Sequence, residues 1–280
     1  MMKSQTLATK ILILAMLLTA CSSSAPKKDL PTDDGSGSAE VETAAPAESK
    51  SFAAPTPAKA GNASALADAI RSGNDDSIFH AGSASLMQNP NDVKALNAMG
   101  LYHYRKGRPL AARLFFRKAL TIQPKSSELY SNIGLTYLST KEEDEAIVNF
   151  RKAIEINPSD ASASVNLGSI YLAHREFAKA YNVLSLSPSR NKDIKFLNNF
   201  AIVSAWKGNT EQAEGLYREA LKSSPNNREL LFNYAILQID FQGKYKDGLE
   251  TLDHLKLIGL AESMKNTEKE LEIKAKAGLK

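Results

Sequence analysis

The chain has 280 residues, of which 43% are hydrophobic and 24% are charged, and these proportions are typical of a folded soluble protein. Its net charge of +4 is modest and its basic residues are spread along the chain, so the composition carries no signature of nucleic-acid binding. The single cysteine excludes an intramolecular disulfide framework and a metal cluster built of cysteines.

Residues 1–20 have the pattern of a signal peptide. Lys3 and Lys10 precede an unbroken apolar run, residues 11–18, which is too short to span a hydrocarbon core of roughly 30 Å. The sequence Leu-Thr-Ala-Cys then ends at Cys21 and resembles the bacterial lipobox, which implies cleavage before Cys21 and a covalent lipid on it. The alternative is an ordinary signal peptide followed by an incidental cysteine.

The lipid would decide where the protein resides. Several acyl chains on one residue anchor a protein stably, since each buried CH₂ contributes roughly 0.8 kcal/mol. Ser22 follows the cysteine, which is similar to the enterobacterial pattern for export to the outer membrane. We therefore expect a lipid-anchored protein at the outer membrane, facing the periplasm, with the cell membrane as the alternative.

Residues 21–61 predict a disordered linker behind the lipidated Cys21. They are rich in serine, alanine, proline, glycine and acidic residues, and apart from Leu30, Val41 and Phe52 they offer nothing that could form a core. A random coil of this length has a reach of roughly 35 Å. The linker would let the body search below its membrane for a partner.

A fixed period governs the body of the chain. Pro90, Pro124 and Pro158 lie 34 residues apart, and Pro225 follows 67 residues later. Two places after these prolines, or in the matching register, stand residues that commonly cap helix N-termini: Asp92, Ser126, Asp160, Asp193 and Asn227. A proline ends one helix and the cap begins the next, so the pattern predicts that a helix restarts every 33 to 34 residues.

Each unit contains two apolar stripes at helical spacing. In the clearest unit the first stripe is Tyr130, Ile133, Gly134 and Tyr137, and the second is Ala146, Phe150 and Ala153. The preceding unit repeats the pattern with Leu96, Met99, Gly100 and His103, then Ala112, Phe116 and Ala119. Over about 170 residues this pattern resembles the tetratricopeptide repeat (TPR). The resemblance implies an all-α fold, a right-handed superhelical solenoid of antiparallel helix pairs.

The predicted organisation follows from these units. It is a signal peptide at 1–20, the lipidated linker at 21–61, a degenerate helix pair at 62–92, repeats at 93–126, 127–160, 161–193 and 194–227, an atypical repeat at 228–259, and a capping helix at 260–280. Pro188 predicts an early end to its helix, as a hinge or as a simple shortening. The atypical repeat has one inserted residue, and atypical ends are what a solenoid needs to shield its core.

The TPR resemblance also implies a partner-binding groove lined by positions 2, 5, 9, 12 and 13 of each first helix. The groove residues expected to bind an envelope protein or peptide are Leu101, Tyr104, Arg105, Leu138, Asn198, Ile202, Trp206, Phe232 and Ile239. Apolar and aromatic residues on a solvent-facing stripe favour docking. The competing interpretation is that such residues only fill the space between consecutive first helices.

Asparagines recur at position 6 of the first helices, at Asn132, Asn166, Asn199 and Asn233. A structural role is the simpler interpretation, because the repeat consensus often carries asparagine there. The alternative is that their amides bind the backbone of a partner, since an amide both donates and accepts.

No pattern in the sequence predicts catalysis or metal binding. The four histidines, at 80, 103, 174 and 254, fall in different units without metal-ligand spacing, and there is no phosphate-binding loop or HExxH motif. We expect no enzyme activity and no cofactor other than the lipid.

The architecture is similar to that of lipoproteins that pilot type IV pilus secretins or serve Tad-pilus and gliding machineries. This resemblance implies a scaffold that assists assembly or stability of an envelope machine. The alternative is an adaptor for periplasmic cell-wall hydrolases or proteases, and self-association through the groove stays open.

Overall fold

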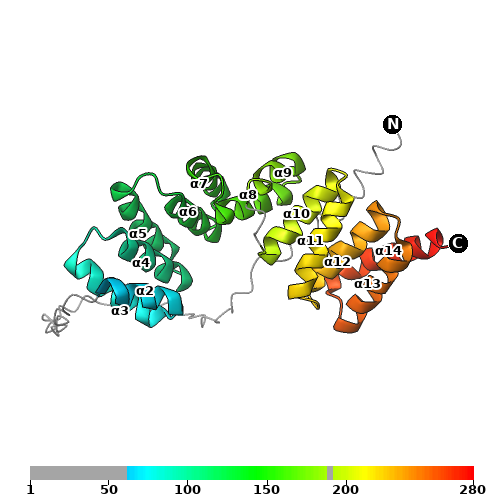
Figure 1. The fold of residues 1–280 in the computed structure, drawn as a ribbon, viewed down its shortest axis with the longest axis horizontal. Helices are drawn as coiled ribbons and strands as arrows, with labels where there is room; N and C mark the ends of the chain where they lie inside the picture. Colours follow the sequence, from blue (N-terminus) through cyan, green and yellow to red (C-terminus); the bar gives the residue numbers. More distant parts are fainter. Residues whose placement is uncertain (1–61, 188–191) are drawn as a thin grey trace, which may run out of the picture.

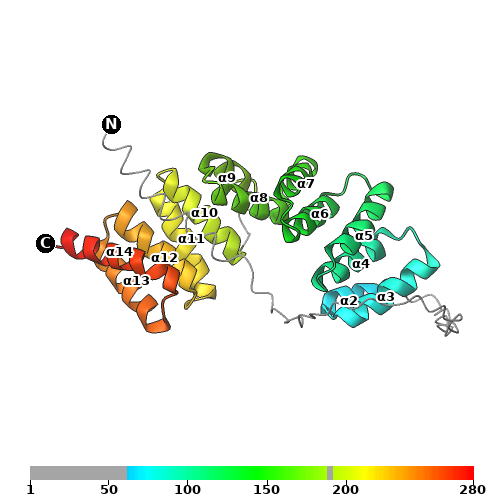
Figure 2. The same ribbon diagram turned by 180° about the vertical axis from the view of Figure 1, so that it is seen from behind.

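The computed structural model describes residues 62–187 and 192–280, and every regular element within these ranges is a helix. The predicted all-α solenoid is confirmed. The predicted signal peptide, Cys21, the linker and Pro188 lie outside the described residues. Figure 1 shows the helix pairs following one another along an arch, with α2 and α3 at one end and α14 at the other, and Figure 2 shows the arch from behind.

The first helices of the pairs are α2 (Asn62–Ser72), α4 (Val93–Arg105), α6 (Ser127–Ser139), α8 (Ala161–Ala173), α10 (Ile194–Trp206) and α12 (Arg228–Ile236). The second helices are α3 (Asp75–Gln88), α5 (Pro109–Ile122), α7 (Glu143–Ile156), α9 (Phe177–Leu184), α11 (Thr210–Ser223) and α13 (Tyr245–Ile258). A π-helical turn, η1 (Leu237–Phe241), extends α12, and a 3₁₀ turn, η2 (Glu262–Met264), leads into α14 (Lys265–Gly278).

The predicted N-caps are confirmed at all five positions. Asp92, Ser126, Asp160, Asp193 and Asn227 each have a non-helical backbone, and each side-chain oxygen accepts a hydrogen bond from an N–H in the first turn of the helix that follows. These bonds satisfy donors that the helix itself cannot. The caps therefore fix where each repeat begins.

The turn from the first helix to the second requires a left-handed residue at the same place in every repeat. Gly107, Gly208 and Gly243 occupy it with φ of 68°, 92° and 66°. In the second and third repeats the residues are Lys141 and Arg175, with φ of 64° and 60°. Side chains rarely adopt this conformation, so these two turns are strained.

A small residue on each first helix lets the second helix approach closely. A Cβ added to Gly134 would lie 2.7 Å from Cε1 of Phe150, and one added to Gly100 would lie 2.3 Å from Cε1 of Phe116. Both phenylalanines are fully buried. The recurring glycine that the sequence shows is thus half of a glycine–aromatic contact at the centre of the first two repeats, and in the third repeat Gly168 faces Leu184 instead.

The inserted residue of the atypical repeat is accommodated in η1. There the N–H of Gln242 bonds to the carbonyl of Leu237, five residues earlier instead of four. Such a bulge takes up one extra residue without breaking the helix. It also aims Ile239 at Gly248, where an added Cβ would lie 2.3 Å from Cγ1 of Ile239.

The two ends are closed differently. At the N-terminal end, Leu66, Ala69 and Ile78 from α2 and α3 bury against Ala95 and Ala98 of α4. At the C-terminal end the expected capping helix starts later than predicted, because residues up to Met264 form a loop and η2 before α14 begins at Lys265. The predicted early end of the second helix before Pro188 is seen as α9, which has 8 residues where its counterparts have 14.

Candidate functional site

The stripe that the TPR resemblance implies for partner binding lies on the first helices, which run along the inner side of the arch at α6 and α8, beneath α7 and α9 (Figure 1). In the first two repeats this stripe is accessible. Leu101, Tyr104 and Leu138 are half-buried, and Arg105 is exposed. The apolar parts of these side chains therefore remain available to another molecule.

In the last two repeats the same stripe is closed, which corrects the sequence-based expectation. Ile202 and Phe232 have no exposed surface, Ile239 is 1% exposed and Asn198 is 4% exposed. Trp206 is half-buried, with its ring stacked on Phe177 at 5.7 Å between centroids. Of the predicted groove residues in this part of the solenoid, only Trp206 retains appreciable accessible surface.

The closure arises from packing between repeats. Val165, Leu172, Ile202, Phe232 and Ile236 belong to one continuous core cluster that extends from the third repeat to α14. Their side chains fill the space between successive first helices, which is the alternative that the sequence left open. The inner stripe thus changes from accessible to filled along the chain.

The asparagine ladder joins consecutive repeats. The Nδ2 of Asn132 donates to Oδ1 of Asn97 at 2.8 Å, and Asn97 in turn donates to Glu128 at 2.7 Å. The last two repeats repeat this triad: Asn233 donates to Asn198 at 2.9 Å, and Asn198 donates to Glu229 at 3.0 Å. Each triad ties a first helix to the one before it.

The middle of the ladder has different partners. Asn199 donates to the hydroxyl of Ser169 at 2.8 Å, and Asn166 donates to the carbonyl of Ser162 in its own helix. The Nζ of Lys195 reaches Oδ1 of Asn166 at 3.2 Å. All four position-6 asparagines therefore make contacts within the chain, as the structural interpretation expects.

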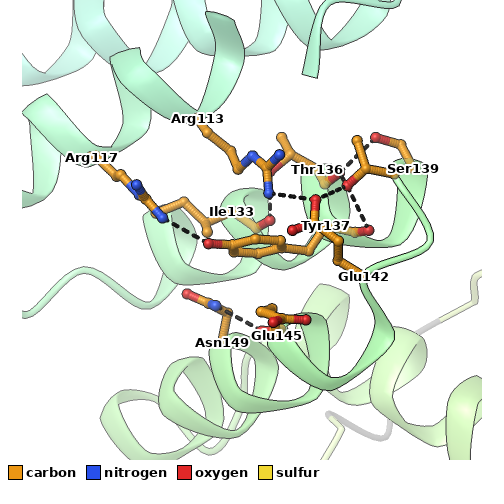
Figure 3. Close-up of polar contacts among 10 residues, drawn as sticks. Arg113, Arg117, Ile133, Thr136, Tyr137, Ser139, Glu142, Glu145 and Asn149 are labelled. Atoms are coloured by element: carbon orange, nitrogen blue, oxygen red, sulfur yellow. Dashed lines mark hydrogen bonds and ion pairs between the residues drawn. The ribbon is translucent and has the colours of Figure 1, made fainter. Parts of the chain in front are cut away.

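A second polar joint lies where a second helix meets the turn of the next repeat. Figure 3 shows Arg113 and Arg117 of α5 reaching across to the second repeat. Arg113 lies over the ring of Tyr137 and pairs with Glu142 at 2.8 Å, while Arg117 donates to the Tyr137 hydroxyl at 2.7 Å. Hydrogen bonds from Thr140 and Arg113 lower the pKa of Glu142.

The joint between the fourth and fifth repeats has an ion pair at the same repeat positions with the charges reversed. Glu214 stands on α11 where Arg113 stands on α5, and it pairs with Lys244 at 2.6 Å, at the start of the next second helix. Arg218 stands where Arg117 stands, and its Nε donates to the Tyr234 hydroxyl at 3.2 Å. Sequence reasoning missed both joints, although the equal repeat positions of these charges could have indicated them.

The histidines occupy separate environments. His103 stacks on Phe115 at 5.2 Å between ring centroids. Burial of the His103 ring, and to a lesser extent the positive charge of Arg108, lower the pKa of His103. His174 contacts Glu143, whose hydrogen bond and charge raise the His174 pKa. Across residues 62–187 and 192–280, no three histidine, cysteine or acidic side chains are grouped so that they could hold a metal ion.

The membrane anchor predicted at Cys21 lies outside the described structure. The structure therefore gives no information on lipid attachment. Among the helices of the described ranges, none has the length and apolar character needed to cross a bilayer.

Comparison with known proteins identifies the repeats. Residues 63–127 and 127–160 match models of the tetratricopeptide repeat, so the N-terminal pair α2–α3, predicted as degenerate, falls within a matched range. No curated protein matches the sequence.

Solved structures share the fold. YrrB, described as a TPR protein with an unusual peptide-binding site, has a TM-score of 0.56 and 17% identity over 68% of this chain and 97% of its own. PilF of Pseudomonas aeruginosa has a TM-score of 0.51 and 18% identity over 65% of this chain and 88% of its own. A MamA RS-1 double mutant has a TM-score of 0.50 and 15% identity over 59% of this chain and 93% of its own. At these identities the likeness concerns the fold alone.

Proposed function

Because the chain carries tetratricopeptide repeats and its described residues fold as a TPR solenoid, we propose that it is a membrane-anchored scaffold that binds a segment of another envelope protein along its inner stripe. One observation carries the proposal. Leu101, Tyr104 and Leu138 stay partly exposed on α4 and α6, whereas the equivalent stripe of the last two repeats is filled.

The accessible stripe has the chemistry of a docking surface. Covering its apolar area would contribute roughly 25 cal/mol per Å². Tyr104 adds a rigid ring with a polar tip, the kind of side chain that often dominates binding energy, and Arg105, which pairs with Asp75, lies exposed at the edge. These features suit an extended or helical protein segment with apolar anchors.

The signal-peptide and lipobox pattern supports the anchored part of the proposal. A lipid on Cys21 would hold the body at the outer membrane, and the linker at 22–61 would let it reach a partner in the periplasm. The architectural resemblance to pilus and gliding lipoproteins supports assembly or stabilisation of an envelope machine as the role.

The binding surface is tested by crosslinking and purifying the protein from its own cells. We expect Tyr104→Ala and Leu138→Ala to reduce recovery of one reproducible envelope protein several-fold. Val148→Ala is the matched control, because Val148 is an apolar side chain 65% exposed on α7, outside the stripe. Equal recovery with all three variants would remove the inner stripe as the binding surface.

The anchor is tested separately with Cys21→Ala. We expect wild-type protein to take up labelled fatty acid and to sediment with outer membranes. The variant should lose the label and leave the membrane fraction. A variant that keeps both properties would refute lipidation at Cys21, whatever the result for the stripe.

A further inference from the structure

The first repeat has an unusual distribution of charge. From Val93 to Ser127 the chain carries eight lysines and arginines and no aspartate or glutamate. The corresponding repeats from 127 and 194 both contain acids as well as bases. An excess of one sign on one repeat produces a local field that the modest net charge of the chain conceals.

Half of these cations are used within the fold. Arg105 and Lys106 pair with Asp75, Arg113 pairs with Glu142, and Arg117 bonds to Tyr137. Within the described ranges, the four others make no ion pair: Lys94, Arg108, Lys118 and Lys125. All four are exposed.

Two leucines accompany three of these cations on the solvent-facing side of α5. Leu110 is 66% exposed and Leu114 is 70% exposed. Leu110, Leu114 and Lys118 follow one another at intervals of four residues, which places the three side chains in one row on the helix surface. Arg108 and Lys125 flank the two ends of α5. We call Arg108, Leu110, Leu114, Lys118 and Lys125 the basic leucine face.

The other second helices lack this combination. At the positions of Leu110 and Leu114, α7 carries Asp144 and Val148, and α11 carries Glu211 and Gly215. The basic leucine face is therefore a property of α5 and not of the repeat. Its exposed leucines have no role in the fold described above.

We propose that the basic leucine face docks the chain's own acidic segment, residues 29–49. That segment carries six acids and no base. Its two larger apolar residues are placed beside acids, as Asp29-Leu30 and as Glu40-Val41-Glu42. Charge and apolar character thus complement the cations and leucines of α5.

The connection is long enough. Twelve residues separate position 49 from Asn62, the first residue of α2, and they can extend to about 40 Å. Between α2 and α5 lie α3 and α4, and packed helices are about 8–10 Å apart, so the separation to cover is about 30 Å. A tethered segment also has an effective concentration on the millimolar scale, so weak complementarity suffices for occupancy.

The docked state is tested by zero-length carbodiimide crosslinking of the detergent-solubilised full chain, followed by peptide mass spectrometry. We expect Lys118 and Lys125 to form amide bonds with acids of residues 29–49 several-fold more often than Lys222, an exposed lysine on α11. High salt should reduce these crosslinks, because screened charges attract less.

A double variant, Arg108→Glu with Lys125→Glu, keeps Lys118 as the reporter. We expect its crosslinks to residues 29–49 to fall several-fold while its thermal melting stays unchanged, since both altered side chains are exposed. Tyr104→Ala, which tests the proposed inner stripe, should leave these crosslinks intact, so the two proposals can fail independently.

Three results would overturn the docking proposal. One is equal crosslinking of Lys118 and Lys222 to residues 29–49. Another is crosslinks that join two chains and rise with protein concentration, which would make a second copy the occupant. In the third, these crosslinks are absent, the protein binds phosphatidylglycerol vesicles, and Leu114→Asp abolishes that binding. This result would show that the basic leucine face binds a membrane surface.

Discussion

Tyr217 places a polar atom where the other repeats have none. Its ring fills the position of Phe116 and Phe150 and is 1% exposed, but its hydroxyl has no hydrogen-bond partner among the described residues. Burial raises the pKa of the phenol, so the group stays protonated. A buried hydroxyl without a partner costs free energy that the rest of the joint must offset.

We expect Tyr217→Phe to leave stability unchanged or to raise the free energy of unfolding by about 1 kcal/mol, because it removes the unpaired hydroxyl without leaving a cavity. Tyr234→Phe is the matched control. The Tyr234 hydroxyl accepts from Arg218, so its loss should cost about 1 kcal/mol. Urea unfolding of both variants measures the difference, and a clear loss of stability in Tyr217→Phe would show that the hydroxyl has a partner.

Lys141 is strained by the turn that it occupies. Glycine should relieve its left-handed backbone, and Lys141→Gly should therefore stabilise the second repeat by about 1 kcal/mol. The reciprocal change, Gly208→Ala, should destabilise the fourth repeat by a similar amount, since an added Cβ there meets no neighbour within 4 Å and only the backbone is affected. Thermal melting of both variants checks the sign, and a destabilised Lys141→Gly would contradict this account of the turn.

At the scale of the helix pair, the close contact of Gly134 with Phe150 predicts that a methyl group added at Gly134 lowers the stability of the fold. Gly134→Ala should lower the free energy of unfolding by about 1–3 kcal/mol, because the phenylalanine ring must move. Gly215→Ala is the control: this glycine lies within α11, and an added Cβ meets nothing within 4 Å. It should stabilise by about 0.5–1 kcal/mol through helix propensity, and equal effects of both changes would reject the close-approach explanation.

The elements were largely predictable from the sequence because their signals are local. The five caps, the glycine–aromatic spacing and the early end of α9 each depend on residues within one unit. The π-helical turn could be predicted only in part. The spacing from Ala235 to Gly248 shows that one residue is inserted. The position of the turn that accommodates this residue depends on packing against α13. The strain at Lys141 and Arg175 could have been inferred from the glycines at the same repeat position.

At the scale of the whole molecule, the C-terminal end depends on charge. Glu272 of α14 bonds to Lys256 and Lys276, which lowers its pKa to about 2. A carboxylate with a depressed pKa contributes stability above its unfolded pKa of 4.5, and this contribution is lost as the pH falls towards 2.

We therefore expect acid to loosen α14 between about pH 4.5 and pH 2. Because the pair is partly exposed, its contribution is at most about 1 kcal/mol. Hydrogen exchange of α14 amides as a function of pH measures the effect. Glu272→Gln should remove this pH dependence, whereas Glu270→Gln, at an exposed position without an ion pair among the described residues, should preserve it.

The accessible part of the inner stripe could be predicted only in outline. Repeat positions identify the stripe, but whether it stays open depends on how closely successive first helices pack. Ile202 occupies the repeat position of the accessible Leu101, and Ile239 occupies that of Tyr104 and Leu138, yet the core of the last repeats encloses both. That distinction depends on contacts between units and is not contained in the periodicity of one unit.

The reversed ion pairs have a consequence for how such an array can grow. The asparagine triads at the first and last joints would tolerate an exchange of neighbours between them, because both use the same residue types. The ion pairs would not tolerate that exchange. If the fifth repeat followed the first, Lys244 would lie against Arg113. If the second repeat followed the fourth, Glu142 would lie against Glu214. Either exchange would bring like charges together, so these two ion pairs favour the neighbours that the repeats already have at the first and last joints.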